Sequence, residues 1–298
     1  MSAKYLNYME TTPLEMEEMI KENPIAFVPF GSLEWHGPHN VLGTDSAIAT
    51  GICERTAEVT GGVLFPCVNW GAFYTMNFPY TMHFPKKPYI KMTKKIVEQL
   101  YDWGFRIIVL FTGHYPGAQI KNVMNAAKWI SKKHDDCFAI GIPEQELIPD
   151  LGNFGDHAAD WETSFMLAMG HQVHLDRLPD NLNYPERAIT QGIMGKDPKL
   201  HASKEKGEQA LKECVKRLSG AIFKVKETRS IEPFDLIYSN FMKLRKDIFN
   251  WKKKGNIGKI FESQGFNNRS EAIAFFKWFA AKGKKHDPNY VYKEKVSD

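Results

Sequence analysis

Short apolar runs alternate with helix-like segments through the first half of the chain. Four apolar runs are typical of buried strands: Ile25–Phe30, Val63–Val68, Arg106–Phe111 and Cys137–Ile142. Helix-like segments lie between and after them, at Asp45–Val59, Tyr89–Trp103, Gly117–Lys133 and Asp160–Met169. Strands separated by helices of this length favour βαβ units, because a helical crossover makes the two strands parallel. The sequence therefore predicts an α/β fold built on a mostly parallel sheet.

Other segments extend or interrupt this alternation. Thr12-Pro-Leu-Glu15 carries a capping-box pattern with proline in the first helical turn, so a helix should begin there. Residues 69–88 are rich in aromatic residues and prolines and predict a long loop or hairpin near the functional site. A helix is expected from about Ser203 to Glu227, and a lysine-rich, largely helical region from Ile231 to Asp298. We therefore expect one domain over residues 1–230 and a helical C-terminal extension over residues 231–298.

The composition narrows the class of protein. A length of 298 residues with 25% charged residues is ordinary for a packed globular protein. The net charge of +4 is small and no nucleic-acid-binding module is recognisable, so we expect no nucleic-acid partner. No apolar stretch reaches membrane-spanning length and the N-terminus lacks a signal-peptide pattern, so no membrane partner is expected. Four scattered cysteines without a C-x-x-C pair indicate reduced thiols and a cytoplasmic location.

Side chains that bind metals or move protons fall in three clusters. The first follows the predicted strand at residues 25–30 and consists of Glu34, His36, His39 and Asp45. The second is His114, in a glycine-flanked turn after the third predicted strand. The third precedes a short helix and consists of Asp156, His157, Asp160 and Glu162. Parallel sheets bind ligands at the carboxyl ends of their strands, and carboxylates with imidazoles are ligands that zinc, manganese and iron prefer. The clusters suffice for two divalent ions, with Asp45 a natural bridge.

Each of these residues also has a structural explanation. Asp45 could cap the following helix, and Glu162 could be an ordinary carboxylate in a first helical turn. His114 taken alone is more often a loop residue than a ligand. Trp35, Tyr115 and Trp161 could be packing aromatics. Most of the remaining histidines should be solvated: His39, His83, His134, His171, His174, His201 and His286. The joint occurrence of three clusters in one α/β chain favours the metal site.

Three motifs together resemble the creatininase (creatinine amidohydrolase) family. They are Gly31-Ser-Leu-Glu-Trp-His-Gly-Pro-His with Gly-Thr-Asp45, then Thr-Gly-His114, then His157-Ala-Ala-Asp-Trp-Glu-Thr-Ser164. Their order and spacing are similar to the family's across residues 26–168. The resemblance implies a three-layer α/β/α fold with a parallel sheet, a homo-oligomer that is commonly a hexamer, and two divalent metal ions per subunit, namely zinc, manganese or iron.

The resemblance also implies roles for individual residues. Glu34, His36, Asp45 and His114 match metal ligands, with Asp45 bridging, and Glu162 matches an acidic residue that is a ligand or supports one. His157 matches the catalytic histidine, which handles the proton as the bond breaks. The substrate pocket would be walled by Trp35, Tyr80, Tyr115 and Trp161. The implied reaction is hydrolysis of a small cyclic amide or carbonyl compound by a water that the two metals activate.

Two departures from the family pattern concern the substrate. Creatininase proper has a glutamate two residues after the histidine that matches His114, and this chain has Pro116 there. The family's Phe-Pro-Gly-Thr segment is Phe78-Pro-Tyr-Thr81 here, with Tyr80 in place of glycine and Asn77 where histidine is usual. These changes disfavour creatinine and leave two substrate classes open: lactams or formamides, and cyclic keto-polyols such as 3-dehydro-scyllo-inosose. A non-catalytic relative that only binds a metal or ligand is a third interpretation.

Overall fold

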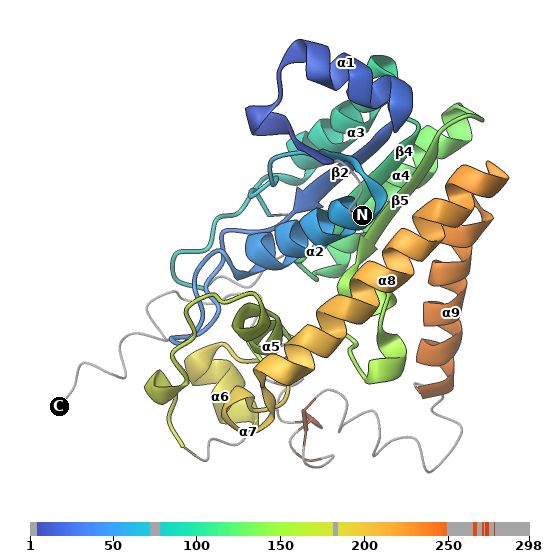
Figure 1. Ribbon diagram of the computed structural model, residues 1–298. Helices are drawn as coiled ribbons and strands as arrows, with labels where there is room; N and C mark the ends of the chain where they lie inside the picture. Colours follow the sequence, from blue (N-terminus) through green and yellow to red (C-terminus); the bar gives the residue numbers. More distant parts are fainter. Residues whose placement is uncertain are drawn as a thin grey trace.

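Five parallel strands form the centre of the molecule (Figure 1). The computed structural model describes residues 5–71, 78–180 and 184–248, together with residues 265, 266, 270, 272, 273 and 277. The strands are β1 (Tyr5–Asn7), β2 (Ile25–Phe30), β3 (Gly62–Leu64), β4 (Ile107–Thr112) and β5 (Phe138–Pro143). They are arranged in the order β1-β3-β2-β4-β5, and every neighbouring pair is parallel. The predicted α/β class with a parallel sheet is confirmed.

Helices cover both faces of the sheet, because alternate residues of each buried strand point to opposite sides. On one face Phe27, Val109 and Ile140 pack against α2 (Thr44–Thr60), α8 (Lys204–Thr228) and α9 (Glu232–Ile248). On the other face Val28, Leu110 and Ala139 pack against α1 (Pro13–Glu22), α3 (Lys86–Trp103) and α4 (Gly117–Lys133). The predicted three-layer α/β/α arrangement is therefore present (Figure 1).

The strand order reverses between β2 and β4. The chain leaves β2 through α2 on one face of the sheet and leaves β4 through α4 on the other. The register pairs Phe30 with Thr112 and Thr112 with Pro143, so β2, β4 and β5 end at the same edge. In parallel α/β sheets this reversal is where ligands bind, at the carboxyl ends of the strands. The first two polar clusters of the sequence follow β2 and β4.

The predicted elements agree with the structure to within a few residues, with two exceptions. The second predicted strand, Val63–Val68, is shorter and ends at Leu64, since Pro66 lacks the N–H that a ladder requires, and only a single bridge joins Val68 to Phe30. α3 begins at Lys86, inside the predicted loop, because the first turn of a helix tolerates a proline such as Pro88. Residues 72–77 of that loop lie outside the described part of the chain.

Several short elements were not predicted. They are β1, the 3-10 turns η1 (Tyr8–Glu10), η2 (Glu144–Glu146), η3 (Pro149–Leu151) and η4 (Leu175–Arg177), and the helices α6 (Tyr184–Gln191) and α7 (Pro198–His201). By contrast, α5 (Asp160–Ala168) was expected over Asp160–Met169 and is confirmed. The capping box at the start of α1 is also present, with Thr12 and Glu15 bonding to each other's backbone N–H groups. No described helix combines the length and the apolar composition that a membrane span requires.

α9 belongs to the region expected as a helical extension, and it packs directly on the sheet. Phe234 is buried in the core, and the Tyr238 hydroxyl bonds to both backbone groups of Gly141, accepting from the N–H at 3.0 Å and donating to the carbonyl at 2.9 Å. Gly141 lies on β5, at the end of the strand order, so α9 covers an edge of the sheet. The expected boundary at residue 230 falls in the turn between α8 and α9, and the division into two units stays a prediction.

Candidate metal centre

Two glycines bring the candidate ligands together. Gly31 follows β2 and Gly113 follows β4, and both lie against the first turn of α2. A Cβ atom on Gly113 would lie 2.2 Å from the carbonyl oxygen of Asp45, and one on Gly31 would lie 2.2 Å from the Ser46 hydroxyl. Any side chain at either position would push the helix away from the strand ends. The glycines therefore allow Asp45, in that first turn, to approach residues that follow both strands.

Asp45 lies between two histidines. Its Oδ1 is 2.8 Å from Nε2 of His36, and its Oδ2 is 2.8 Å from Nδ1 of His114. Each histidine also faces a second carboxylate. His36 Nε2 is 3.4 Å from Oε2 of Glu162, and His114 Nδ1 is 3.0 Å from Oε2 of Glu34. The five side chains thus form two triads that share Asp45, with ligand atoms within 4.8 Å of one another in each.

The donor atoms of the triads lie at ion-pair distances from one another in a buried space. All five side chains are at most 2% exposed. Within the described part of the chain, Glu34 Oε2, His36 Nε2 and both carboxylate oxygens of Asp45 have no partner with hydrogen-bond geometry. Buried polar atoms that lack partners are rare in native proteins, and a bound ion is one of the few explanations. Imidazole and carboxylate donors in this arrangement fit zinc, manganese or iron.

In the metal-free chain the carboxylates hold protons on the two histidines. Burial opposes protonation of His36, but Asp45 and Glu162 overcome it and raise its pKa to about 10. Burial likewise opposes protonation of His114, and Glu34 with Asp45 raises its pKa to about 10. Nδ1 of His36 lies 3.0 Å from the carbonyl oxygen of Glu34. A ring that donates its Nδ1–H there presents Nε2 to an ion once the second proton leaves.

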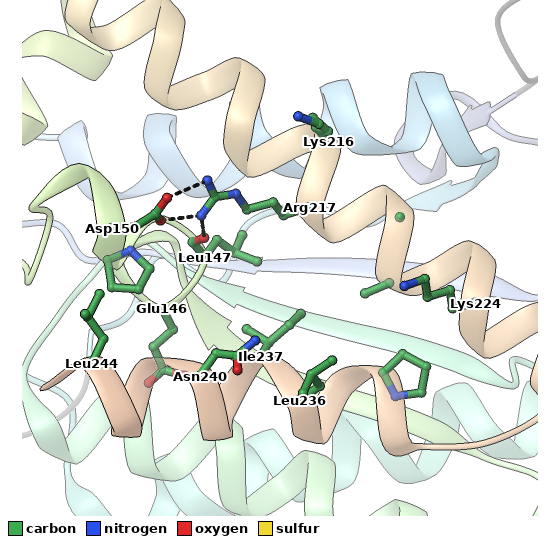
Figure 2. Close-up of a pocket in the computed structure, with 14 residues that line it drawn as sticks. Glu146, Leu147, Asp150, Lys216, Arg217, Lys224, Leu236, Ile237, Asn240 and Leu244 are labelled. Atoms are coloured by element: carbon green, nitrogen blue, oxygen red, sulfur yellow. Dashed lines mark hydrogen bonds and ion pairs between the residues drawn. The ribbon is translucent and has the colours of Figure 1, made fainter. Parts of the chain in front are cut away.

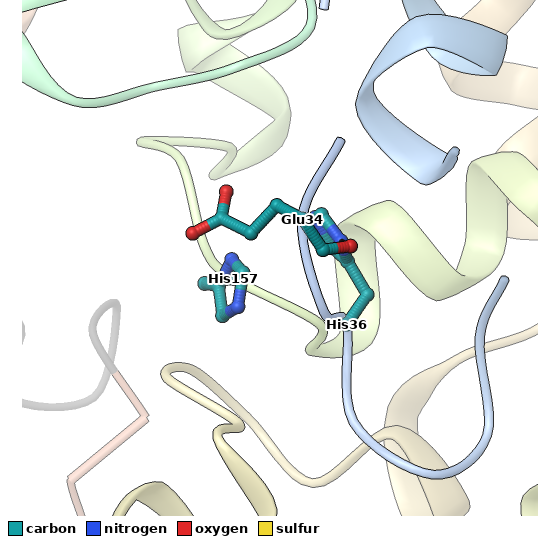
Figure 3. A group of neighbouring side chains, drawn as sticks. All are labelled: Glu34, His36 and His157. Carbon is teal, nitrogen blue, oxygen red and sulfur yellow. Dashed lines mark hydrogen bonds between the residues drawn. The ribbon is translucent and has the colours of Figure 1, made fainter. Parts of the chain in front are cut away.

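His157 lies beside Glu34 and His36 (Figure 3), and its charge state differs from that of the two histidines in the triads. Its ring centroid is 4.5 Å from that of His36, and the Phe78 ring stacks on it at 5.2 Å. Burial lowers the pKa of His157 to about 4; Glu34 opposes this shift and His36 adds to it. Its Nε2 lies 3.1 Å from the Trp35 carbonyl oxygen. A neutral ring that donates from Nε2 to this carbonyl leaves Nδ1 as the atom that can accept a proton.

Asp156 positions Glu162 at the start of α5. Its two carboxylate oxygens accept from the backbone N–H groups of Trp161 at 2.8 Å and Glu162 at 3.3 Å, which caps the helix. Glu162 itself accepts from the Ala158 N–H. Burial raises the pKa of both Asp156 and Glu162 well above the usual carboxylate range. Asp160, from the same predicted cluster, instead forms an ion pair with Lys206.

The structure brings some of the predicted substrate-binding residues to the centre and places others apart. The Trp35 ring lies 5.4 Å from Phe78, which stacks on His157. The Tyr115 hydroxyl is buried and faces Glu144. Tyr80 is 67% exposed. The Trp161 ring lies under the ammonium group of Lys206 at 3.8 Å, beside a hollow that none of the five candidate ligands lines. Substrate binding by these four residues stays a prediction.

Tyr80 adopts a backbone conformation that favours glycine, with φ of 57°. A left-handed conformation costs a non-glycine residue roughly 1–2 kcal/mol, and glycine in turn costs some unfolded-state entropy. We therefore expect Tyr80→Gly to raise the free energy of unfolding by about 0.5–1 kcal/mol in urea titrations. Tyr80→Ala keeps the strain and serves as the control. A Gly variant no more stable than the Ala variant would count against strain at this position.

Sequence reasoning missed two buried polar residues and misplaced one. Glu144 and Asn153 are both fully buried near the strand ends. Glu144 directly follows an apolar run, which is the same signal that selected Glu34, so it could have been found. His39 was expected to be solvated, which is wrong: it is 1% exposed, and its Nε2 lies 3.1 Å from the Thr163 hydroxyl. This contact joins the segment that follows β2 to α5, and no sequence pattern predicts it.

A separate cavity of about 500 Å³ lies between α8, α9 and the turns after β5 (Figure 2). Its wall is largely apolar, with Leu147 and Ile237 among the lining residues. Arg217 closes one side, where its guanidinium bonds to Asp150 and to the Leu147 carbonyl. None of the five candidate metal ligands is among the lining residues. The cavity is therefore not part of the candidate centre.

Comparison with protein families gives one decisive match. The family model described as creatinine amidohydrolase matches residues 9–222, which cover strands β2 to β5, both triads and most of α8. The chain belongs to the creatininase family. It is accordingly a hydrolase of that family, and α9 lies beyond the matched region.

Two curated relatives resemble this creatininase-family chain. Creatinine amidohydrolase of Pseudomonas putida is 26% identical over 229 residues, which are 66% of this chain and 88% of the relative. The 3-dehydro-scyllo-inosose hydrolase of Thermotoga maritima is 26% identical over 110 residues, or 36% of this chain and 35% of the relative. The match to the second enzyme is therefore partial.

Solved structures of creatininase share the fold. A crystal structure of creatinine amidohydrolase (creatininase) aligns with a TM-score of 0.63 and 25% identity, over 74% of this chain and 98% of that one. A manganese form aligns with a TM-score of 0.63 and 26% identity, over 74% of this chain and 98% of that one. A Zn–Zn form of a creatininase variant aligns with a TM-score of 0.58 and 25% identity over the same shares. The creatininase fold predicted from the motifs is confirmed.

Proposed function

We propose that the chain is a metal-dependent hydrolase that uses two divalent cations, zinc, manganese or iron, to open or cleave a small cyclic amide or carbonyl compound. The observation that carries the proposal is the position of Asp45, whose two oxygens each lie 2.8 Å from a different histidine. A carboxylate shared in this way suits a two-metal site. The manganese and Zn–Zn forms of related creatininases support the same choice of ions.

Each triad would hold one ion. Glu34, Asp45 and His114 are the ligands of the first, and His36, Asp45 and Glu162 are the ligands of the second. Bound there, two divalent cations supply a water of lowered pKa and polarise a carbonyl oxygen of the substrate. Asp156 keeps Glu162 in place through its bond to the Glu162 N–H.

A residue of the chain, His157, would transfer the proton that the leaving group needs. His157 is neutral at physiological pH because burial holds its pKa near 4, so Nδ1 can take up a proton and pass it to the leaving group. The bond from Nε2 to the Trp35 carbonyl fixes the ring, and the stacked Phe78 excludes water from one face. The residues thus bind the ions, orient the proton carrier and keep the site dry.

The substrate within this class is proposed in two forms. A cyclic amide or formamide is supported by the relative from Pseudomonas putida, and a keto-inositol by the partial match to the Thermotoga maritima enzyme. Pro116 stands at the N-cap of α4, so no carboxylate is available at the position where creatininase proper has glutamate. This departure counts against creatinine itself and makes a keto-inositol the second candidate substrate.

A hydrolysis screen with zinc, manganese or iron supplied tests the proposal. The panel comprises lactams, formamides and keto-inositols, and we expect turnover of at least one class that chelation abolishes. A chain that binds two ions but hydrolyses no compound of this panel is a non-catalytic relative. A chain that binds no divalent ion overturns the proposed function.

Metal uptake should release protons. His36 and His114 have pKa values of about 10 in the metal-free chain, so both carry a proton at pH 8 that a metal ion must displace. We expect release of at least about two protons per chain at pH 8, and metal affinity that rises as the pH increases toward 10. Calorimetric titration in buffers of different ionisation enthalpy measures this release. A binding heat independent of the buffer would contradict the assignment of these histidines.

We also propose that the chain acts on its substrate as a homo-oligomer, a hexamer in particular. The support is the resemblance to creatininases alone. Light scattering on the eluted protein gives the subunit number directly, and a monomer at working concentration would overturn this point.

A further inference from the structure

His39 lies between two segments that both contribute to the candidate metal centre, and the proposed function assigns it no role. One segment follows β2 and carries Glu34 and His36. The other runs from His157 into α5 and carries Glu162. The triad proposed to hold the second ion takes His36 from the first segment and Glu162 from the other. Its geometry therefore depends on how these two distant parts of the chain are held together.

The bonds of Glu162 to its own segment do not settle this. The Glu162 N–H donates to Asp156 at 3.3 Å, and its carboxylate accepts from the Ala158 N–H. These partners are only six and four residues away along the chain. They would fix Glu162 on its helix wherever that helix lay. The position of α5 relative to His36 needs contacts between the two segments.

The His39 ring makes such contacts. It is buried, and its Nε2 lies 3.1 Å from the hydroxyl oxygen of Thr163, the residue that directly follows Glu162. The ring also faces the backbone of Ala158, the residue that directly follows His157. One side chain from the segment after β2 thus reaches the immediate neighbours of both the proposed ligand and the proposed proton carrier.

The bond between His39 and Thr163 suits an uncharged imidazole. The Asn40 amide donates to the Thr163 hydroxyl at 3.1 Å, which leaves the hydroxyl proton for Nε2 of His39. Only a neutral ring can accept that proton. Burial lowers the pKa of His39 to about 3, and the charge of His36 adds to this shift, so the ring is neutral. Thr163 is fully buried, and a buried hydrogen bond of this kind orients the groups that it joins.

We propose that His39 is a positioning residue for the second ion, and that through Thr163 it holds Glu162 within reach of His36. This inference rests on the proposed function, because it assumes that the triad containing Glu162 binds an ion. The triad proposed for the first ion takes no ligand from α5. Loss of the His39 contact should therefore weaken one ion and spare the other.

Zinc titration of the full chain tests this inference, because it measures the two ions separately. His39→Leu cannot bond to Thr163, and we expect the affinity for one zinc ion to fall about 10–100-fold while that for the other stays unchanged. Elemental analysis after dialysis should then find one zinc ion per chain in place of two. His39→Gln supplies an amide that can bond to the Thr163 hydroxyl, so it should recover most of the lost affinity. A purely structural role would lower the melting temperature without separating the two ions.

Variants of Thr163 test the same bond from its other end. Thr163→Val removes the hydroxyl and should weaken the same zinc ion, whereas Thr163→Ser keeps the hydroxyl and should retain both ions. A chain that carries both His39→Leu and Thr163→Val should bind zinc no more weakly than either single variant, because the two changes remove one shared bond.

His134→Leu is the matched control. The His134 ring stacks on Tyr101 at 3.7 Å, and the residue follows α4 at the end opposite His114. This variant should keep both ions. Unchanged affinity for two ions in His39→Leu and Thr163→Val, or loss of both ions together, would overturn the inference and leave the proposed function standing. A wild-type chain that binds fewer than two zinc ions would instead contradict the proposed function.

Discussion

Replacing Asp45 with asparagine should remove both divalent ions and lower the rate of hydrolysis by roughly a thousandfold or more. The expected loss corresponds to about 4 kcal/mol or more of transition-state stabilisation, the scale on which a metal ion acts. The reason is the shared position of Asp45, whose two oxygens each lie 2.8 Å from a different histidine. Asparagine has one oxygen and no charge, so it cannot serve both triads.

Metal content per chain, measured by elemental analysis after dialysis, checks this prediction before any activity is known. Asp150→Asn is the control, because Asp150 lies in a surface ion pair with Arg217 and should keep both ions when replaced. An Asp45→Asn variant that retains two ions per chain would show that the triads do not share this carboxylate.

Replacing His157 with alanine should leave both ions bound and lower the turnover number by about 10²–10⁴. His157 belongs to neither of the triads that contain Asp45, and it is neutral because burial lowers its pKa to about 4. Its loss therefore removes a proton carrier without removing a charge from the centre. The turnover number and the metal content together separate this role from that of a ligand.

Two further variants sharpen the test of His157. His171→Ala changes an exposed histidine and should leave turnover unchanged. His157→Gln keeps a side chain against Phe78 and cannot carry the proton, so it should be as slow as the alanine variant. Unchanged turnover in both His157 variants would remove this residue from the mechanism, and loss of an ion would make it a ligand.

Much of the fold was predictable because the deciding signals are local. β2 and α4 have the predicted bounds, since an uninterrupted apolar run and a helical segment between clear ends each specify their own conformation. The capping box at Thr12 acts within a single turn. β1 was missed because three residues carry no period, and only the pairing of Tyr5 with Gly62 makes them a strand.

The candidate centre was predictable in its residues and not in its geometry. Glu34, Asp45 and His114 stand at strand and helix ends, where polar side chains are conspicuous after apolar runs. The burial of Asn153 depends on how distant segments pack, so it could not be seen in the sequence. Tyr80 was noticed as a departure from glycine, but only the structure gives it a φ of 57°.

The contact of Gly31 and Gly113 with the first turn of α2 has a consequence for ion size. Backbone atoms, and not flexible side chains, set the separation of Asp45 from the residues after β4. Zinc binds oxygen and nitrogen at about 2.0–2.2 Å, whereas calcium needs six to eight oxygens at about 2.3–2.6 Å. A calcium ion would have to move α2 off the strand ends, and α2 is held there by the packed core. We therefore expect the two glycines to make the proposed metal site selective for small ions, because they fix the distance of α2 from the strand ends.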